Sequence, residues 1–223
     1  MRYLLLFLLL AILYGGSLSA QPPGYVGKRA ILSFDTYSFP NLFLVLDESY
    51  PFRFNYRMGV SGEYVLSRRF SVGGVFNGYQ TQTDYHFRGS YGLMRIDGSD
   101  TGLFLKSYTF RQRGNIAPIG PYQKLEFLYT RYRMVDLDRL FYSDARTDLG
   151  RSDDLIVAIT FGTQHVLANH ITYHWGLHSA WLFKALDNQR QSDQEQHLKD
   201  VSTTRLRGIF GFSINIGIGV LLW

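Results

Sequence analysis

The amino-acid sequence predicts an all-β fold, an eight-stranded antiparallel up-and-down transmembrane β-barrel. Three observations predict it: an N-terminal export signal, eight later segments of alternating apolar and polar residues, and connections that alternate between long and short. The composition agrees, because 46% of the residues are hydrophobic and only 18% are charged, which is unlike a disordered chain. The mean hydropathy of −0.09 excludes a membrane protein built from several spanning helices.

Residues 1–20 predict a cleaved signal peptide. Arg2 supplies the positive charge, and an apolar core follows from Leu4 to Tyr14. A spanning helix needs about 20 apolar residues, but Gly15-Gly16 interrupts this stretch before that length is reached. The sequence therefore predicts export across the inner membrane and removal of the signal.

The predicted cleavage follows Ser19 or Ala20, and we take Gln21 as the first mature residue. We expect residues 21–28 to form a short periplasmic lead-in and residues 29–223 to form the barrel domain. Because the chain has no cysteine, a disulfide scaffold, a thiolate zinc site and a lipid-anchored N-terminal cysteine are excluded.

Eight segments alternate apolar and polar residues with a period of two, the pattern of a strand with one apolar face. No stretch after the signal shows a sustained helical period, so no helix is expected. The clearest apolar faces are Phe54, Tyr56, Met58, Val60, Tyr64 and Leu66; Ile171, Tyr173, Trp175, Leu177, Trp181 and Phe183; and Leu206, Phe210, Phe212, Ile214, Ile216, Ile218, Val220 and Leu222. Weaker segments begin near Ala30, Phe70, Leu103, Leu125 and Leu155.

The segment 103–112 is the poorest of the eight. Lys106 shares a face there with Phe104 and Tyr108, which would place a charge among apolar residues. We expect either a β-bulge that shifts the register or a lysine that reaches a headgroup layer.

Alternation alone does not say which face points outward. In a soluble lipocalin-like barrel the apolar face points inward, whereas in an outer-membrane barrel it meets lipid. The apolar faces here run for about nine or ten residues, which is the length that crosses hydrocarbon. Tyr and Trp gather toward the segment ends, and the opposite faces carry Gly and charges of both signs. The membrane orientation is therefore favoured, and the secreted carrier of a hydrophobic ligand is the soluble alternative.

The connections alternate in length. The predicted long ones are residues 38–51, 84–101, 135–153 and 187–203, and the predicted short ones are residues 67–69, 114–120 and 169–170. Long extracellular loops and short periplasmic turns produce this alternation. An even number of strands also places both ends of the barrel domain on the periplasmic side.

The signal, the eight segments and the final stretch 218–223 together resemble the small eight-stranded outer-membrane β-barrels, the porin-like family, over about residues 25–223. The resemblance implies an outer-membrane location in a Gram-negative type of envelope, with membrane lipid around the barrel. It also implies that the barrel-assembly machinery reads the terminal aromatic residue, here Trp223. Because Trp223 is odd-numbered and the apolar face is even-numbered, we expect a bulge near Leu221 or a frayed end.

An eight-stranded barrel is only just wide enough inside for side chains, and charges confined there must be paired. We therefore expect the polar faces to form a lumenal charge network with a structural role. Its predicted members are Asp35, Arg53, Arg57, Glu63, Lys124, Glu126, Lys184, Arg205 and Arg207.

Histidine and serine are the candidates for chemistry. His174 and His178 share a face, but residues four apart on a strand are about 13 Å apart, so a lumenal hydrogen-bonding role is favoured over a shared metal. A lipid acyl hydrolase or transferase would use His with Ser and an acidic group near the outer leaflet. Ser38, Ser49 and Ser152 lie near the predicted outer ends, but none sits in a distinctive motif. We assign no catalytic residue, metal or cofactor, and the lipid-modifying enzyme stays an alternative.

The expected function is that of a non-enzymatic outer-membrane barrel with an envelope structural role, a surface-interaction role or limited passage of small solutes. Loops 38–51 and 187–203 are the candidate contacts for an extracellular ligand, because function usually lies on loops that a rigid scaffold carries. The first loop has several apolar residues close together, and the second is polar and Gln-rich, which predicts a solvated, mobile segment. The net charge of +5 is modest and no Lys/Arg run is long, so no nucleic-acid partner is expected.

Overall fold

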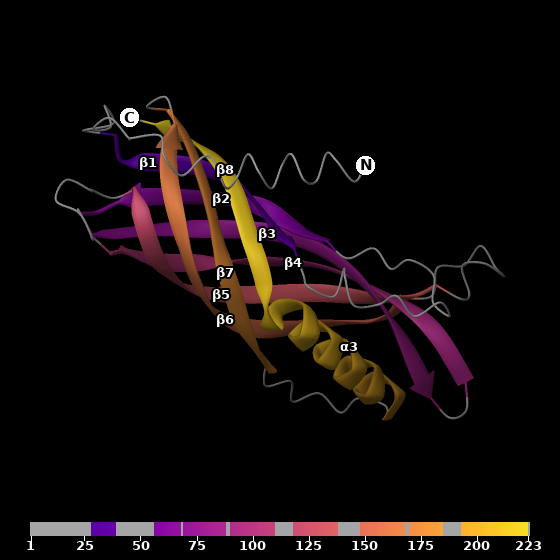
Figure 1. The fold of residues 1–223 in the computed structure, drawn as a ribbon. Coiled ribbons are helices and arrows are strands. Elements are labelled where there is room, and N and C mark those ends of the chain that lie inside the picture. Colours follow the sequence, from indigo (N-terminus) through magenta and orange to yellow (C-terminus); the bar gives the residue numbers. More distant parts are fainter. Residues whose placement is uncertain are drawn as a thin grey trace, which may run out of the picture.

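A computed structural model describes residues 28–38, 56–67, 69–87, 90–109, 118–137, 148–167, 170–184 and 193–222 of the chain. These ranges form β1 (Ala30–Ser38), β2 (Tyr56–Val65), β3 (Phe70–Phe87), β4 (Ser90–Tyr108), β5 (Gly120–Asp136), β6 (Asp148–Leu167), β7 (Ile171–Lys184), α3 (Asp193–Gly211) and β8 (Ser213–Leu222). The eight strands of the described ranges close into one barrel (Figure 1), in which each strand pairs antiparallel with its sequence neighbours and β8 pairs with β1. The predicted all-β fold, a closed eight-stranded antiparallel up-and-down barrel, is confirmed.

The predicted signal peptide 1–20, nearly all of the lead-in 21–28, most of loop 38–51, Arg53 and Trp223 lie outside the described residues. Among the residues that the structure describes, no helix is both long enough and apolar enough to cross a membrane.

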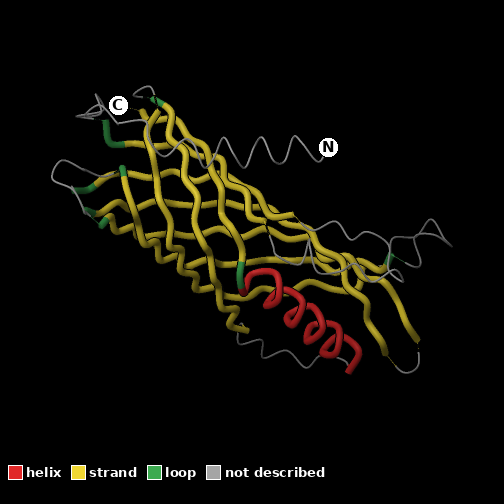
Figure 2. The backbone as a smooth tube through the Cα atoms, in the orientation of Figure 1, coloured by secondary structure: helices red, strands yellow, loops and turns green. Residues whose placement is uncertain are grey.

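The strands differ in length, and this gives the barrel an oblique end. At one end, Ala30 of β1 lies opposite Leu222 of β8; we call this the terminal end. At the other end, the mouth, β3, β4, β5 and β6 run on beyond β1, β2 and β8 (Figure 2). Tyr56, the residue of β2 nearest the mouth, lies opposite Gln80. Beyond Gln80, within the part of the chain that the structure describes, β3 pairs with β4 only. The inner face of this extension needs a cover.

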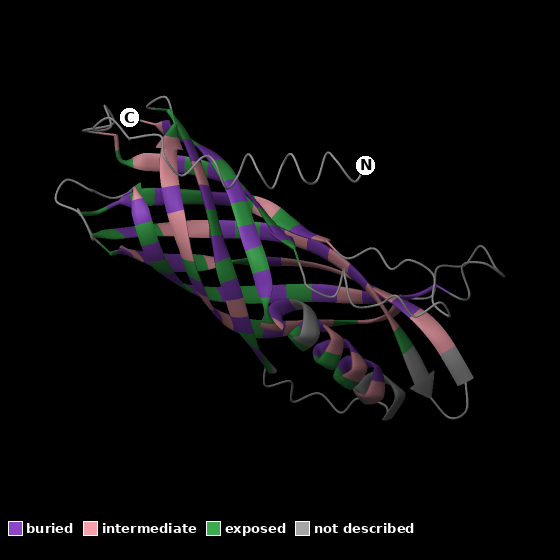
Figure 3. Ribbon diagram, in the orientation of Figure 1, coloured by how far each residue is buried: buried purple, intermediate pink, exposed green. Residues whose placement is uncertain are grey.

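The two faces of the barrel differ in chemistry, and burial alternates along the strands (Figure 3). Large apolar side chains with outward exposure include Leu32, Phe34, Val60, Phe76, Leu103, Phe127, Leu155, Trp175, Trp181, Ile216 and Ile218. Polar and charged residues occupy buried inward positions between them. The soluble lipocalin-like arrangement requires the reverse, so the structure contradicts that alternative.

Strand β4 has the sidedness opposite to the one expected. Leu103 and Leu105 point outward, whereas Phe104 and Lys106 are buried inside. The pairing of β4 with β3 and β5 shows no register shift at this point. Both expectations, a β-bulge and a lysine that reaches a headgroup layer, were therefore wrong. The apolar face of β4 that points outward is the odd-numbered one, so Lys106 lies on the inner face.

The strict alternation of long and short connections was also wrong. The segment 84–101 is not a loop, since β3 continues to Phe87 and β4 begins at Ser90. Beyond the apolar belt, outward positions need not be apolar, so a strand there loses its alternating pattern and looks like a loop in sequence.

Residues 193–203 of the predicted loop and the first residues of the predicted last strand form α3 instead. Residues 198, 202, 206 and 210 are spaced by four, which places them on one face of a helix. These four positions are also all even-numbered. In the sequence, the buried face of the helix therefore looks like a continuation of the even-numbered apolar face of β8. The expectation of a solvated, mobile loop at 187–203 was wrong for the part that α3 contains.

Candidate functional site in the barrel lumen

The lumen is closed at the terminal end by an apolar floor. Its members are Ile31, Leu221, Ile119 and Val166 in one group and Val65, Tyr108 and Tyr122 in another. The floor separates the charged interior from solution at this end. Burial of apolar surface around an ionic layer also strengthens each polar contact, because little water screens it.

The first ionic cluster lies next to the floor and is centred on Glu63 of β2. Its carboxylate accepts hydrogen bonds from Ser71 Oγ and Tyr108 Oη, each at 2.6 Å, and Lys106 Nζ lies 3.0 Å from Oε2. Lys106 also donates to Gln164 Oε1. Glu63 and Lys106 are both buried. A buried ion pair is tolerated when hydrogen bonds satisfy the remaining atoms, which is the case for this carboxylate.

The second cluster joins β1 and β7 through Asp35. Asp35 Oδ1 lies 2.7 Å from His174 Nε2, and Ser61 Oγ donates to Oδ2 at 2.6 Å. Because an ionised carboxylate only accepts hydrogen bonds, the imidazole carries a proton on Nε2. Gly217 of β8 lies against this pair, and a Cβ there would overlap both the imidazole and the carboxylate.

The third cluster is built on Arg57 of β2, one of the largest fully buried side chains. Its Nε and Nη2 lie 3.0 and 3.3 Å from the two carboxylate oxygens of Asp100, a two-point contact that fixes both groups. Asn77 Nδ2 donates to the same carboxylate at 2.6 Å. The guanidinium also lies 4.1 Å from the ring centre of Tyr37 and 4.9 Å from that of Phe210 on α3. Arg57 therefore connects the ionic layer to the apolar one.

A histidine extends this cluster to Glu126. Arg57 Nη1 lies 3.2 Å from His178 Nε2, and because a guanidinium only donates, Nε2 accepts and the neutral ring carries its proton on Nδ1. That Nδ1 lies 2.9 Å from Thr160 Oγ1 and 3.4 Å from Glu126 Oε2. Lys124 Nζ lies 3.1 Å from the other Glu126 oxygen.

Helix α3 closes the lumen on the mouth side. Leu198, Leu206 and Phe210 are fully buried on one face of the helix, together with Ser202, whose Oγ donates to the Leu198 carbonyl at 2.8 Å. Phe210 packs edge to face on Tyr79 with ring centres 5.2 Å apart. The strands contribute Met94, Ile96, Leu128, Tyr132, Met134, Ile156 and Leu182 to the same cluster. The helix is the cover that the inner face of the long strands needs.

The lumen is thus an ionic layer between two apolar layers. Its cations are Arg57, Lys106 and Lys124, and its anions are Asp35, Glu63, Asp100 and Glu126. This arrangement holds the strands together through ion pairs between residues far apart in sequence. Such packing is typical of a lumen filled with its own side chains.

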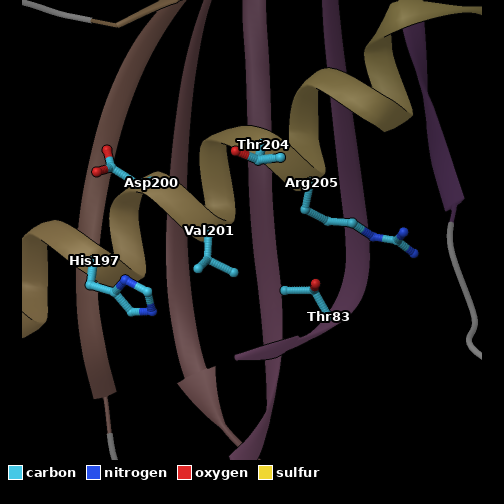
Figure 4. A pocket seen from close by; sticks show the side chains of 6 residues that line it. All are labelled: Thr83, His197, Asp200, Val201, Thr204 and Arg205. Atoms are coloured by element: carbon cyan, nitrogen blue, oxygen red, sulfur yellow. The ribbon is translucent and has the colours of Figure 1, made fainter. Parts of the chain in front are cut away.

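A cavity of about 460 Å³ lies beside α3, outside the ionic layer. It is lined by Thr83, His197, Asp200, Val201, Thr204 and Arg205 (Figure 4). In this view His197 and Asp200 leave the helix in different directions. The two groups therefore do not converge with a threonine hydroxyl as a catalytic triad requires.

The structure places five of the nine predicted network residues inside the barrel. They are Asp35, Arg57, Glu63, Lys124 and Glu126, all buried. Arg53 lies outside the described residues, and Lys184 is described only as the last residue of β7. Arg205 and Arg207 are not lumenal strand residues, because both lie on α3, where Arg207 is exposed and Arg205 lines the cavity.

Two charged members were missed in the sequence. Asp100 had been assigned to a long connection, and Lys106 to an irregular strand. A register set by Leu103 and Leu105 would have placed both inside, because they share the even-numbered face of β4.

The candidate residues for metal binding and catalysis are dispersed. His174 and His178 belong to different clusters, and the described residues contain no group of three or more His, Asp or Glu side chains arranged to hold a metal ion. Ser38 lies on β1 and Ser152 on β6, two strands that are not neighbours in the barrel, and Ser49 lies outside the described residues.

No protein-family model matches the sequence, and no curated protein matches it either. Among solved structures, the chain is similar to the N-terminal β-barrel domain of OprF from Pseudomonas aeruginosa. The TM-score is 0.44 and the sequence identity 10%, with 86% of this chain and 97% of that chain covered. The fold and the function of this chain therefore rest on its own geometry.

Proposed function

We propose that this chain is an exported, integral outer-membrane β-barrel with a filled lumen, which serves an envelope structural or surface-interaction role rather than acting as an open channel or an enzyme. The observation that carries the proposal is the inverted sidedness of the barrel. Large apolar side chains cover its outer face, and its ion pairs are buried at the centre.

The outward face supports a lipid environment. Leu103, Phe127 and Ile218 are 71, 57 and 58% exposed, and similar side chains surround them on the neighbouring strands. Soluble proteins rarely expose contiguous apolar patches larger than a few hundred Å². Hydrocarbon around the barrel removes this cost, and closure of the sheet pairs the backbone groups that lipid would leave unsatisfied.

The ends of the barrel support the proposed topology. β1 begins and β8 ends at the terminal end, so a periplasmic terminal end agrees with export through the signal 1–20. The mouth with α3 then faces outward from the cell. As further parts of the proposal, the assembly machinery reads the C-terminal strand with Trp223, and a surface partner contacts the mouth.

A single outward charge tests the proposal. In a membrane barrel an Arg at the middle of the lipid face costs about 2–4 kcal/mol and near the interface about 0–1 kcal/mol. Leu103→Arg should therefore destabilise the barrel in lipid vesicles, whereas Gln123→Arg, on the exposed outer face close to the terminal end, should not. The free energy of unfolding is measured by urea titration of the vesicle-inserted protein.

Extraction of the parent protein from membranes is the second measurement. The parent protein should stay with the membrane fraction after carbonate treatment and should migrate differently on gels before and after heating. If Leu103→Arg proves as harmless as Gln123→Arg and the parent protein is extracted by carbonate, the outer face meets water and the proposal fails.

A further inference from the structure

The outer face between β5 and β6 changes abruptly from apolar to ionic. The outward residue pairs, in order toward the mouth, are Phe127 with Val157, Tyr129 with Leu155, Arg131 with Asp153 and Arg133 with Arg151. On the other side of β5, Asp97 of β4 lies opposite Arg133. This change marks the edge of the outward apolar belt of β5 and β6 on the side of the mouth.

The ionic residues above the edge form a patch that we call the arginine rim. It consists of Arg95, Asp97, Arg131, Arg133, Arg151 and Asp153, four cations and two anions. Asp153 Oδ1 lies 3.6 Å from Arg131 Nε, and Asp97 Oδ2 lies 2.9 Å from Arg95 Nε. With four positive and two negative side chains, the rim has an excess of positive charge.

Arg133 and Arg151 lie directly opposite each other on neighbouring strands. Like charges in this position destabilise a sheet. An anion bound between two guanidinium groups converts the repulsion into two attractive contacts, and planar guanidinium groups match phosphate oxygens in pairs. The rim therefore has the charge and the donor geometry for a phosphate group.

The position of the rim identifies the source of the phosphate. Tyr129 and Leu155 form an apolar shelf one pair below Arg131, and Tyr129 Oη donates to Asp153 at the boundary. Given the outer-membrane location proposed above, on which this inference rests, headgroups lie at this height and acyl chains lie against the shelf. We propose that the arginine rim binds the phosphate groups of an outer-leaflet phosphorylated glycolipid, with its acyl chains packed on the Tyr129 side of the belt.

The test compares two double variants of the full chain. Arg133→Gln with Arg151→Gln removes the opposed charges of the rim, and Arg29→Gln with Arg69→Gln removes two exposed charges at the terminal end as the matched control. Bisphosphorylated lipid A is titrated into each protein in maltoside micelles, and bound lipid is counted by native mass spectrometry. Each basic residue near a charged lipid surface contributes about 1 kcal/mol, so the rim variant should bind about 30-fold more weakly, with the control unchanged.

Further arms separate the alternatives. Dephosphorylated lipid A should bind weakly to every protein, and Arg133→Lys with Arg151→Lys should recover part of the affinity, since the charge remains and only the paired donor geometry is lost. Equal lipid A binding by the rim variant and the control overturns the proposal. Displacement of lipid A by low-millimolar inorganic phosphate also overturns it, because it shows a general anion site.

Membrane insertion is scored separately in phosphatidylcholine vesicles, which contain no glycolipid. A chain that fails to insert contradicts the outer-membrane proposal. A chain that inserts but binds lipid A without using Arg133 and Arg151 contradicts the arginine rim alone.

Discussion

The Glu63–Lys106 pair stabilises the lumen only while both partners are present. In Lys106→Met the Glu63 carboxylate keeps its hydrogen bonds from Ser71 and Tyr108 but loses its buried cation. Removal of one partner of a buried pair costs about 3–5 kcal/mol. We expect a loss of that size in the free energy of unfolding, measured by urea titration in vesicles.

The matched control removes both charges. Glu63→Gln with Lys106→Met leaves no uncompensated charge, so it should be clearly more stable than Lys106→Met alone. Arg29→Met changes an exposed cation at the terminal end and should have little effect. A Lys106→Met protein as stable as Arg29→Met would show that the pair contributes nothing.

Gly217 tests the packing between clusters. A Cβ at this position overlaps His174 and Asp35, whereas a Cβ at Gly62 on the outer face meets no atom within 4 Å among the described residues. We expect Gly217→Ala to destabilise the barrel by about 1–3 kcal/mol, the usual cost of overpacking. Gly62→Ala should be neutral or stabilising by up to about 1 kcal/mol. Heat-modifiable gel migration over a temperature series compares the two, and an equal shift for both would contradict the close approach at Gly217.

The sequence predicts which residues of the ionic layer face inward, but not which residues they contact. Alternation assigned Asp35, Arg57 and Glu63 to the inner face, which is where the structure places them. It did not assign their partners, because partners depend on the stagger between strands. Asp35 and His174 are 139 positions apart in the chain, and no local pattern encodes their contact.

At the scale of the element, α3 is the part that the sequence concealed. A face built from every fourth residue is also a subset of a period-two pattern, so Leu206 and Phe210 were assigned to a strand. Burial separates the two cases, since Leu198, Leu206 and Phe210 pack against the long strands. The polar, Gln-rich start of the segment also suggested solvent, although a helix that covers a mouth needs only one apolar face.

The docking of α3 is testable with one truncation. Leu206→Ala removes a fully buried side chain and should weaken docking by about 2–5 kcal/mol. The helix then opens more often, so trypsin should cut after Lys199 or Arg205 faster than in the parent protein. Thr204→Ala, at an exposed position of the same helix, is the control. Equal cleavage rates for the two variants would mean that α3 is not held by its apolar face.

At the scale of the whole molecule, the closed barrel and its strand order followed from eight alternating segments. The shape of the mouth did not, because strand extensions beyond the apolar belt lose alternation. The sequence therefore predicts a loop over 84–101, where the structure has the end of β3 and the start of β4. Beyond the outward apolar belt, a polar residue fits a strand as well as it fits a loop, so the sequence pattern no longer distinguishes the two.

The filled lumen predicts the ionic conductance of the protein in a bilayer. Beneath α3 lie the Arg57–Asp100 contact, the Glu63–Lys106 pair and the apolar floor, so the helix is one of several barriers in series. We expect no large steady conductance from the parent protein in planar bilayers. Replacement of residues 193–211 by a flexible linker should leave the bilayer equally closed, because ion pairs that are satisfied by one another exclude passing ions. A large steady conductance in the parent would contradict the filled lumen, whereas conductance only in the linker variant would make α3 the sole barrier and the ionic layer permeable.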